Sequence, residues 1–89
     1  MIAPVWRVEF HRAAVSDLRK LGPDGERLRY LRERIASSND PRRFGHALTG
    51  DRKGLWRYRV RDYRIVASIE DDRFVVLVVT VGHRRQVYR

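Results

Sequence analysis

Residues 55 to 64 read Leu-Trp-Arg-Tyr-Arg-Val-Arg-Asp-Tyr-Arg, and this stretch decides how the rest of the chain is interpreted. Successive side chains of a β-strand point to opposite faces, so Arg57, Arg59 and Arg61 are expected on one face. The other face then carries three apolar or aromatic side chains, Trp56, Tyr58 and Val60. Aromatic residues in this position are more typical of a core than of a platform for stacking bases.

The predicted cationic face needs an explanation, because three guanidinium groups on one short strand repel one another. A sheet that only has to be soluble can carry Ser, Thr, Glu and Lys on its outer face. Arginines grouped in this way favour a polyanion as ligand. The alternative is a strand face whose charges are simply solvated.

The amino-acid composition also favours a polyanionic ligand. The chain has 89 residues, enough for one domain with a modest core, and we expect residues 1–89 to form that single domain. Its formal net charge is +9, and eighteen of its 20 basic residues are arginines. Arginine matches phosphate and stacks on bases, so nucleic acid is favoured over a membrane as partner. A genome-wide preference for arginine explains part of the ratio but not the excess of positive charge.

Three absences narrow the class of protein. The chain contains no cysteine, which excludes disulfides, thiolate metal sites and a cysteine nucleophile. Its first residues do not resemble a signal peptide, and its longest apolar run is too short to span a bilayer. We therefore expect a cytoplasmic protein that does not act on membranes.

The periodicity of apolar residues predicts a β-α-α-β-β-β order. Spacings of three and four residues predict helices over 12–21 and 24–37, separated by Gly22-Pro23. Alternation and β-branched composition predict strands over 5–10, 55–61, 64–70 and 74–81. The last strand has almost no polar side and is expected at the centre of the sheet, covered on both faces. Residues 38–54 are expected to form a polar loop.

These elements predict an α+β fold. A small, mainly antiparallel, four-stranded sheet should have the N-terminal helix hairpin packed on one of its faces. Part of the other face is expected to be concave and basic.

Several short motifs occur in a recognisable order along the chain. They are Leu48-Thr49-Gly50, Trp56-Arg57-Tyr58-Arg59, Asp62-Tyr63-Arg64-Ile65, Val81-Gly82-His83-Arg84-Arg85 and Val87-Tyr88. In order and spacing they resemble the RelE/ParE superfamily, the small toxins of bacterial type II toxin–antitoxin systems, over nearly the whole chain. The resemblance implies a RelE-like toxin domain. RelE-like members cut mRNA in the ribosomal A site without a metal ion, whereas ParE-like members poison DNA gyrase.

The RelE resemblance also implies roles for individual residues. In that reaction the ribose 2′-hydroxyl attacks its own 3′-phosphate, giving a 2′,3′-cyclic phosphate and a free 5′-hydroxyl. Arg57 and Arg59 match two strand lysines of RelE, Arg64 the arginine after the turn, Arg84 the tail arginine and Tyr88 a tyrosine near the C-terminus. Arg64 and Arg84 suit bidentate binding of the scissile phosphate. The alternative for Arg64 is an ion pair with the aspartate of the turn.

The general base of such a reaction stays open, because a guanidinium remains protonated and is a poor base. His83, Tyr88 or a group of the ribosome are the candidates. The alternatives are that His83 is a bystander and that Tyr88 stacks on a base or only caps the sheet. Arg61, Lys53 and Arg85 are expected to contact RNA.

No cofactor or metal site is expected. His11 is expected at the start of a helix and His46 in a loop, without the spacing of metal ligands. The expected partners are a RelB-like antitoxin, the ribosome and mRNA, with operator DNA bound only through the antitoxin complex. We expect an endoribonuclease toxin. The alternatives are a ParE-like gyrase poison or inactive nucleic-acid-binding relative, and a plain RNA-binding domain.

Overall fold

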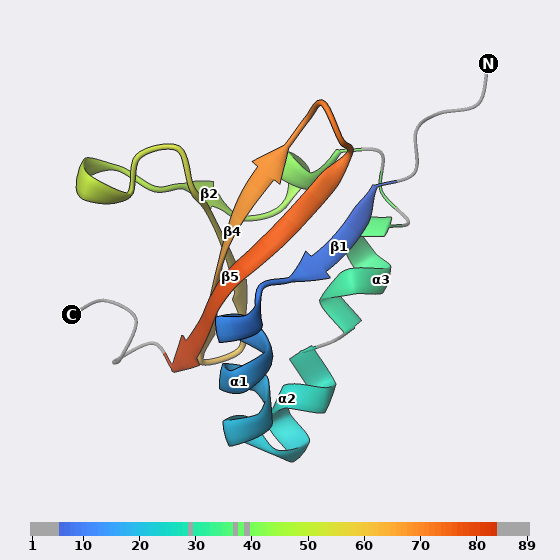
Figure 1. The fold of residues 1–89 in the computed structure, drawn as a ribbon, viewed down its shortest axis with the longest axis vertical. Helices are drawn as coiled ribbons and strands as arrows, with labels where there is room; N and C mark the ends of the chain where they lie inside the picture. Colours follow the sequence, from blue (N-terminus) through green and yellow to red (C-terminus); the bar gives the residue numbers. More distant parts are fainter. Residues whose placement is uncertain (1–5, 29, 37, 39, 84–89) are drawn as a thin grey trace.

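A computed structural model describes residues 6–28, 30–36, 38 and 40–83, with the backbone alone for residues 27, 30, 52 and 83. The elements are β1 (Arg7–Phe10), α1 (Arg12–Leu21), α2 (Pro23–Leu28), α3 (Tyr30–Ala36), the short 3₁₀ helix η1 (Pro41–Arg43), β2 (His46–Ala47), a second 3₁₀ helix η2 (Gly50–Arg52), β3 (Trp56–Val60), β4 (Tyr63–Glu70) and β5 (Val75–His83). Figure 1 shows the helices lying together along one side of a twisted sheet.

The described strands form one sheet in the order β1-β5-β4-β3-β2. All neighbouring strands are antiparallel except β1, which runs parallel to β5. The predicted α+β class with a mainly antiparallel sheet is therefore confirmed. The predicted number of four strands is wrong by one, because the two-residue strand β2 lies in the segment expected to be a loop. Two residues are too short to produce an alternating pattern.

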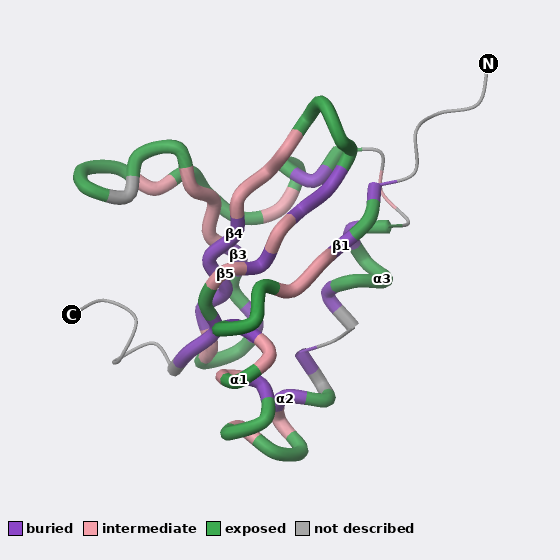
Figure 2. Tube along the Cα trace, in the orientation of Figure 1, coloured by how far each residue is buried: buried purple, intermediate pink, exposed green. Residues whose placement is uncertain are grey.

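The helices bury one face of the sheet. The main core cluster joins Ala14 and Leu18 of α1 with residues of the strands, among them Tyr58, Ile65 and Val76. Figure 2 shows these buried segments where the strands meet the helices. α1 has the predicted bounds, since the imidazole of His11 accepts a hydrogen bond from the amide of Ala13 at its start. None of the described helices combines the length and the apolar character required to cross a bilayer.

Two details of the strands differ from the prediction. The chain reverses at Arg61 and Asp62, so Tyr63 is the first residue of β4 and pairs with Val60. Arg61 has a φ of 54°, which takes it out of the strand. β5 is an interior strand, but the middle position of the sheet belongs to β4. Both faces of β5 are covered at its start, where Val75 and Val76 are fully buried.

Candidate functional site

The antiparallel pair β3–β4 brings three arginines together on the face of the sheet opposite the helices. Arg59 is directly across from Arg64, and Arg57 is across from Val66. Residues opposite each other in an antiparallel pair have their side chains on the same face. Arg57, Arg59 and Arg64 therefore share one surface, as the sequence predicted, and we call it the basic face.

The three arginines differ in their exposure. Arg59 is exposed and Arg57 is half-buried. Arg64 is 7% exposed, and the Nε atoms of both Arg57 and Arg64 are buried. Arg64 lies between Arg59 on one side and Gly82 of β5 on the other, and Gly82 has no side chain to displace it. Surrounding atoms thus restrict the Arg64 guanidinium, which favours a fixed orientation.

This arrangement costs the fold some stability. Like charges directly opposite each other on a sheet are destabilising, by an amount on the order of 0.2–1 kcal/mol. Arg59 and Arg64 form such a pair. A bound anion would remove the repulsion, so the arrangement is suited to a phosphate-bearing ligand.

A hollow of about 240 Å³ lies next to the basic face, at the edge of β3 that β2 leaves uncovered. Its walls come from α3, β3, the segment before β2 and the first residue of β2. They consist of Leu31, Arg34, Phe44, Gly45, His46, Arg57, Tyr58, Arg59 and Val60. The Arg34 guanidinium lies 4.3 Å from the centre of the Phe44 ring, a cation–π contact. The hollow therefore has both apolar residues and arginines in its lining.

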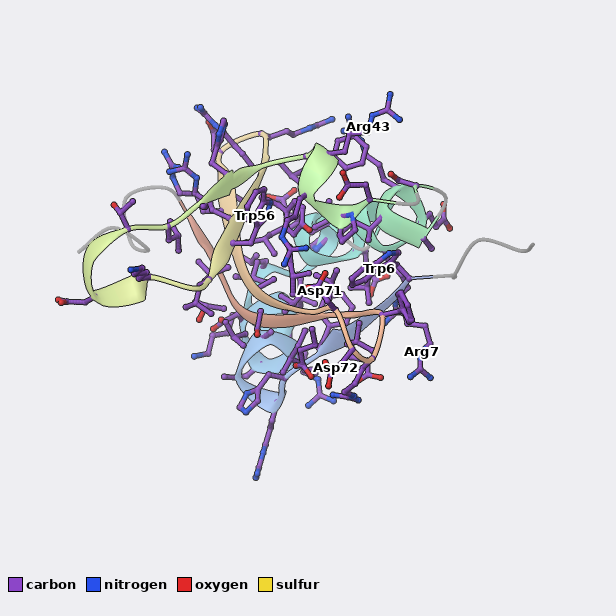
Figure 3. All side chains as sticks on the ribbon, turned by 90° about the horizontal axis from the view of Figure 1, so that it is seen from above. Trp6, Arg7, Arg43, Trp56, Asp71 and Asp72 are labelled. Atoms are coloured by element: carbon purple, nitrogen blue, oxygen red, sulfur yellow. The ribbon has the colours of Figure 1, made fainter. Side chains whose placement is uncertain are left out.

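We call residues 40–48 the strap; this segment leads from α3 toward β3 and contains the edge strand β2. Two aromatic side chains of β3 hold it. The Tyr58 hydroxyl donates to the Pro41 carbonyl oxygen at 2.7 Å, and Trp56 Nε1 donates to the Phe44 carbonyl oxygen at 2.6 Å. In Figure 3, Trp56 points inward toward this segment, whereas Arg43 points outward. Both aromatic residues were predicted to be core, and they also fix the position of the strap.

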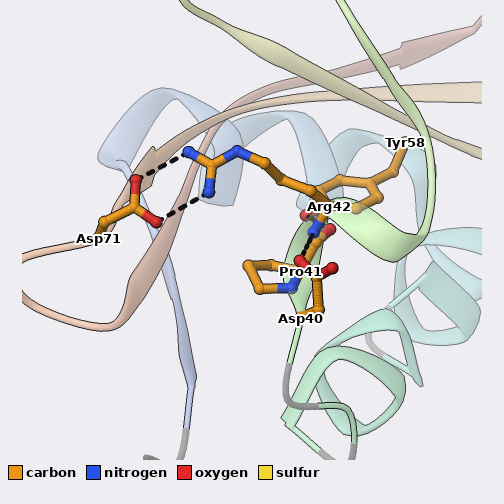
Figure 4. Close-up of polar contacts among 5 residues, drawn as sticks. All are labelled: Asp40, Pro41, Arg42, Tyr58 and Asp71. Carbon is orange, nitrogen blue, oxygen red and sulfur yellow. Dashed lines mark hydrogen bonds and ion pairs between the residues drawn. The ribbon is translucent and has the colours of Figure 1, made fainter.

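An ion pair also links the strap to the turn between β4 and β5. Both guanidinium NH groups of Arg42 donate to the carboxylate of Asp71, each at 2.8 Å, as Figure 4 shows. Hydrogen bonding by Arg42 holds the pKa of the Asp71 carboxyl below its usual value. The Asp40 side chain accepts from the Arg42 amide at 2.9 Å and caps η1. Burial raises the pKa of Tyr58, so its hydroxyl remains a donor at neutral pH.

Hydrogen bonds from the helices support the strands that flank Arg64. The Tyr63 hydroxyl donates to Asp24 of α2 at 2.7 Å, and this bond raises the pKa of Tyr63. The Val81 amide donates to Asp17 of α1 at 3.0 Å. These bonds tie β4 and β5 to the helices close to Arg64.

The remaining predicted site residues lie outside β3 and β4 or outside the part of the chain that the structure describes. Arg61 is exposed in the β3–β4 turn, and Lys53 is exposed in the loop after η2. Figure 1 shows that loop projecting away from the sheet. Arg84, Arg85 and Tyr88 lie outside the described residues. The backbone of His83 ends β5 opposite Tyr63, and its side chain is outside the description.

One residue near the basic face was missed by the sequence. His46 was predicted in a loop, but it lies in β2, directly across from Arg57. It therefore has its side chain on the same face as the arginines. Its neighbours Ala47 and Leu48 lead into the Leu48-Thr49-Gly50 motif, which is the signal that could have drawn attention to it. Within the described residues, no group of three His, Asp or Glu side chains is arranged to hold a metal ion.

The family model for the ParE toxin of type II toxin–antitoxin systems (parDE) matches residues 8–88. The chain belongs to this ParE toxin family. This confirms the resemblance to the RelE/ParE superfamily that the motifs suggested. A toxin RelE of Mycobacterium tuberculosis is 37% identical over 51 residues, which make up 57% of this chain and 53% of that relative. The match thus spans about half the length of that relative.

Solved structures of the superfamily have the same fold. The toxin–antitoxin complex RelBE2 of Mycobacterium tuberculosis contains a chain with a TM-score of 0.81 at 26% identity, covering 91% of this chain and 100% of that one. In the archaeal RelE–RelB complex of Pyrococcus horikoshii the TM-score is 0.69 at 26% identity, with 93% and 99% covered. The isolated RelE toxin of E. coli gives 0.68 at 27% identity, with 93% and 90% covered.

Proposed function

We propose that this toxin is a ribosome-dependent, metal-independent endoribonuclease that cuts mRNA in the ribosomal A site and so inhibits translation. The observation that carries the proposal is the convergence of Arg57, Arg59 and Arg64 on one face through the pairing of β3 with β4. The similarity to RelE toxins supports it. The reaction follows the route implied by the resemblance, with the 2′-hydroxyl attacking the adjacent phosphate.

The basic face is suited to the electrostatic part of this reaction. Attack by the 2′ oxygen places additional negative charge on the phosphate oxygens in the transition state. Donors that are already oriented stabilise such charge without a cost of reorganisation. Arg64 fits this role best, since it is buried and held between two strands. Arg59 and Arg57 are more accessible and are suited to neighbouring phosphates of the RNA backbone.

The test is a translation reaction with purified ribosomes and a defined mRNA, in which cleavage products are mapped by primer extension. Arg59→Gln removes an exposed guanidinium suited to a neighbouring phosphate of the RNA, so it should weaken mRNA binding and lower the cleavage rate at subsaturating toxin concentration. Arg19→Gln is the matched control, because Arg19 is an exposed arginine on α1. Intact mRNA with the folded wild-type protein would refute the proposal.

A second candidate function is poisoning of DNA gyrase, which is favoured by the match to the ParE family model. A supercoiling assay with purified gyrase distinguishes the two. Inhibition of supercoiling together with intact ribosome-bound mRNA would establish the gyrase poison. Cleaved mRNA with unaffected supercoiling would establish the ribonuclease.

We infer that a RelB-type antitoxin neutralises the toxin. The support comes from two of the similar structures, which are complexes of toxin with antitoxin. The net charge of +9 favours an acidic segment of that partner on the basic face. Operator DNA would then be bound through the antitoxin. Antitoxin binding that is as tight to Arg59→Gln as to wild type, over a range of salt concentrations, would contradict the placement of that acidic segment.

A further inference from the structure

We propose that His46 is a catalytic residue of the basic face, where its imidazole takes the proton from the attacking 2′-hydroxyl. The inference rests on the proposed ribonuclease function and supplies the base that the arginines cannot provide. A guanidinium stays protonated in proteins, whereas imidazole exchanges protons readily near neutral pH. Among the described side chains that line the hollow, His46 is the histidine.

The position of His46 follows from the pairing of β2 with β3. His46 is directly across from Arg57, so the two side chains lie on the same face and within reach of one another. His46 is exposed and lines the hollow together with Arg57 and Arg59. A phosphodiester bound by these arginines would thus have an imidazole beside it.

The groups facing His46 come from several elements. Arg57, Arg59 and the phenol of Tyr58 belong to β3, and Arg34 belongs to α3. The hydroxyl of Tyr58 donates its proton to the Pro41 carbonyl oxygen of the strap, so this proton already takes part in a hydrogen bond that supports the fold. Of these, Arg57 and Arg59 are therefore the charged groups on the same face of the sheet as His46, whereas Arg34 and Tyr58 line the hollow from the side of the helices.

The strap holds the backbone that directly precedes His46. Trp56 donates to the Phe44 carbonyl two residues before His46. Gly45 has a φ of 80° and approaches the Arg57 carbonyl so closely that no side chain fits. A fixed backbone next to the imidazole is what a proton-transfer residue requires, because the transfer depends on hydrogen-bond distance to the substrate.

The proposed step conserves atoms and charge. The imidazole accepts the 2′-hydroxyl proton, the 2′ oxygen forms a bond to phosphorus, and the bond from phosphorus to the 5′ oxygen breaks. The imidazolium then gives its proton, through solvent, to the departing 5′ oxygen. The products are the 2′,3′-cyclic phosphate and the 5′-hydroxyl, and the imidazole is restored.

The test measures single-turnover cleavage of ribosome-bound mRNA as a function of pH. His46→Gln should lower the rate constant on the order of 10²-fold or more and remove the fall in rate toward acid pH, as expected for loss of a general base. His11→Asn is the matched control, since His11 caps α1 and asparagine also caps helices. It should keep the wild-type rate and pH profile.

Three outcomes would overturn the inference while leaving the ribonuclease function intact. The first is a His46→Gln protein with the wild-type rate and pH profile. The second is loss of the acid limb in His83→Gln but not in His46→Gln. The third is failure of added imidazole to restore cleavage by His46→Ala, a rescue that a purely structural role would not produce. A wild-type protein that cleaves no mRNA would instead refute the proposed function itself.

Discussion

Replacing Gly45 by alanine tests whether the close contact between strap and sheet matters. Gly45 has a φ of 80°, and an added Cβ would overlap the Arg57 carbonyl oxygen and lie 2.8 Å from Trp56 Nε1. The left-handed conformation costs alanine roughly 1–2 kcal/mol, and forcing an extra carbon into a filled space costs about 1–3 kcal/mol more. Gly45→Ala should therefore lower the melting temperature by roughly 8–40 °C, given about 4–8 °C per kcal/mol in a domain of this size.

Gly50→Ala is the matched control for this prediction. Gly50 has a φ of 67° in the same connection, but nothing lies within 4 Å of an added Cβ. It should show only the conformational cost, a shift of roughly 4–15 °C. The assay is thermal unfolding followed by circular dichroism. Equal shifts for the two variants would refute the claim that the strap is packed closely against β3.

Three further predictions concern other parts of the site. Tyr58→Phe should lower the free energy of unfolding in urea by about 1–3 kcal/mol, because it leaves a buried strap carbonyl without its 2.7 Å donor; an unchanged urea midpoint would contradict this. Arg59→Thr should raise stability by roughly 0.2–1 kcal/mol, since it relieves the repulsion from Arg64 across the strands, while it lowers mRNA cleavage; a loss of stability would show that the pair is not repulsive. Asp71→Asn tests the ion pair between Asp71 and Arg42. This ion pair lowers the pKa of Asp71, so it stabilises the folded protein at pH values above the ordinary aspartate pKa. The stabilisation is lost as the pH falls through the lowered pKa of Asp71 in the folded protein. Urea midpoints measured from neutral to strongly acid pH should show that loss in the wild type and not in the variant, and parallel profiles would contradict it.

The sequence predicted the faces of the longer strands but not the parts that depend on distant contacts. Alternation in residues 56–60 placed Arg57 and Arg59 on one face, and the structure agrees. The burial of Arg64 could not be read in the same way, because it depends on its neighbours in β3 and β5. β2 was missed because a two-residue strand has no periodicity, and it forms where the strap is held by side chains of β3.

One face of β3 holds the strap, and the other face carries the arginines of the basic face. Trp56 and Tyr58 donate hydrogen bonds that hold the strap, and the alternating residues Arg57 and Arg59 form the basic face. A slip of one residue in the pairing would exchange these faces, burying guanidinium groups and releasing the strap together. The same register that presents the arginines therefore also positions His46. Variants that loosen the strap should consequently impair cleavage at temperatures where the protein is still folded, even though they remove no charged group.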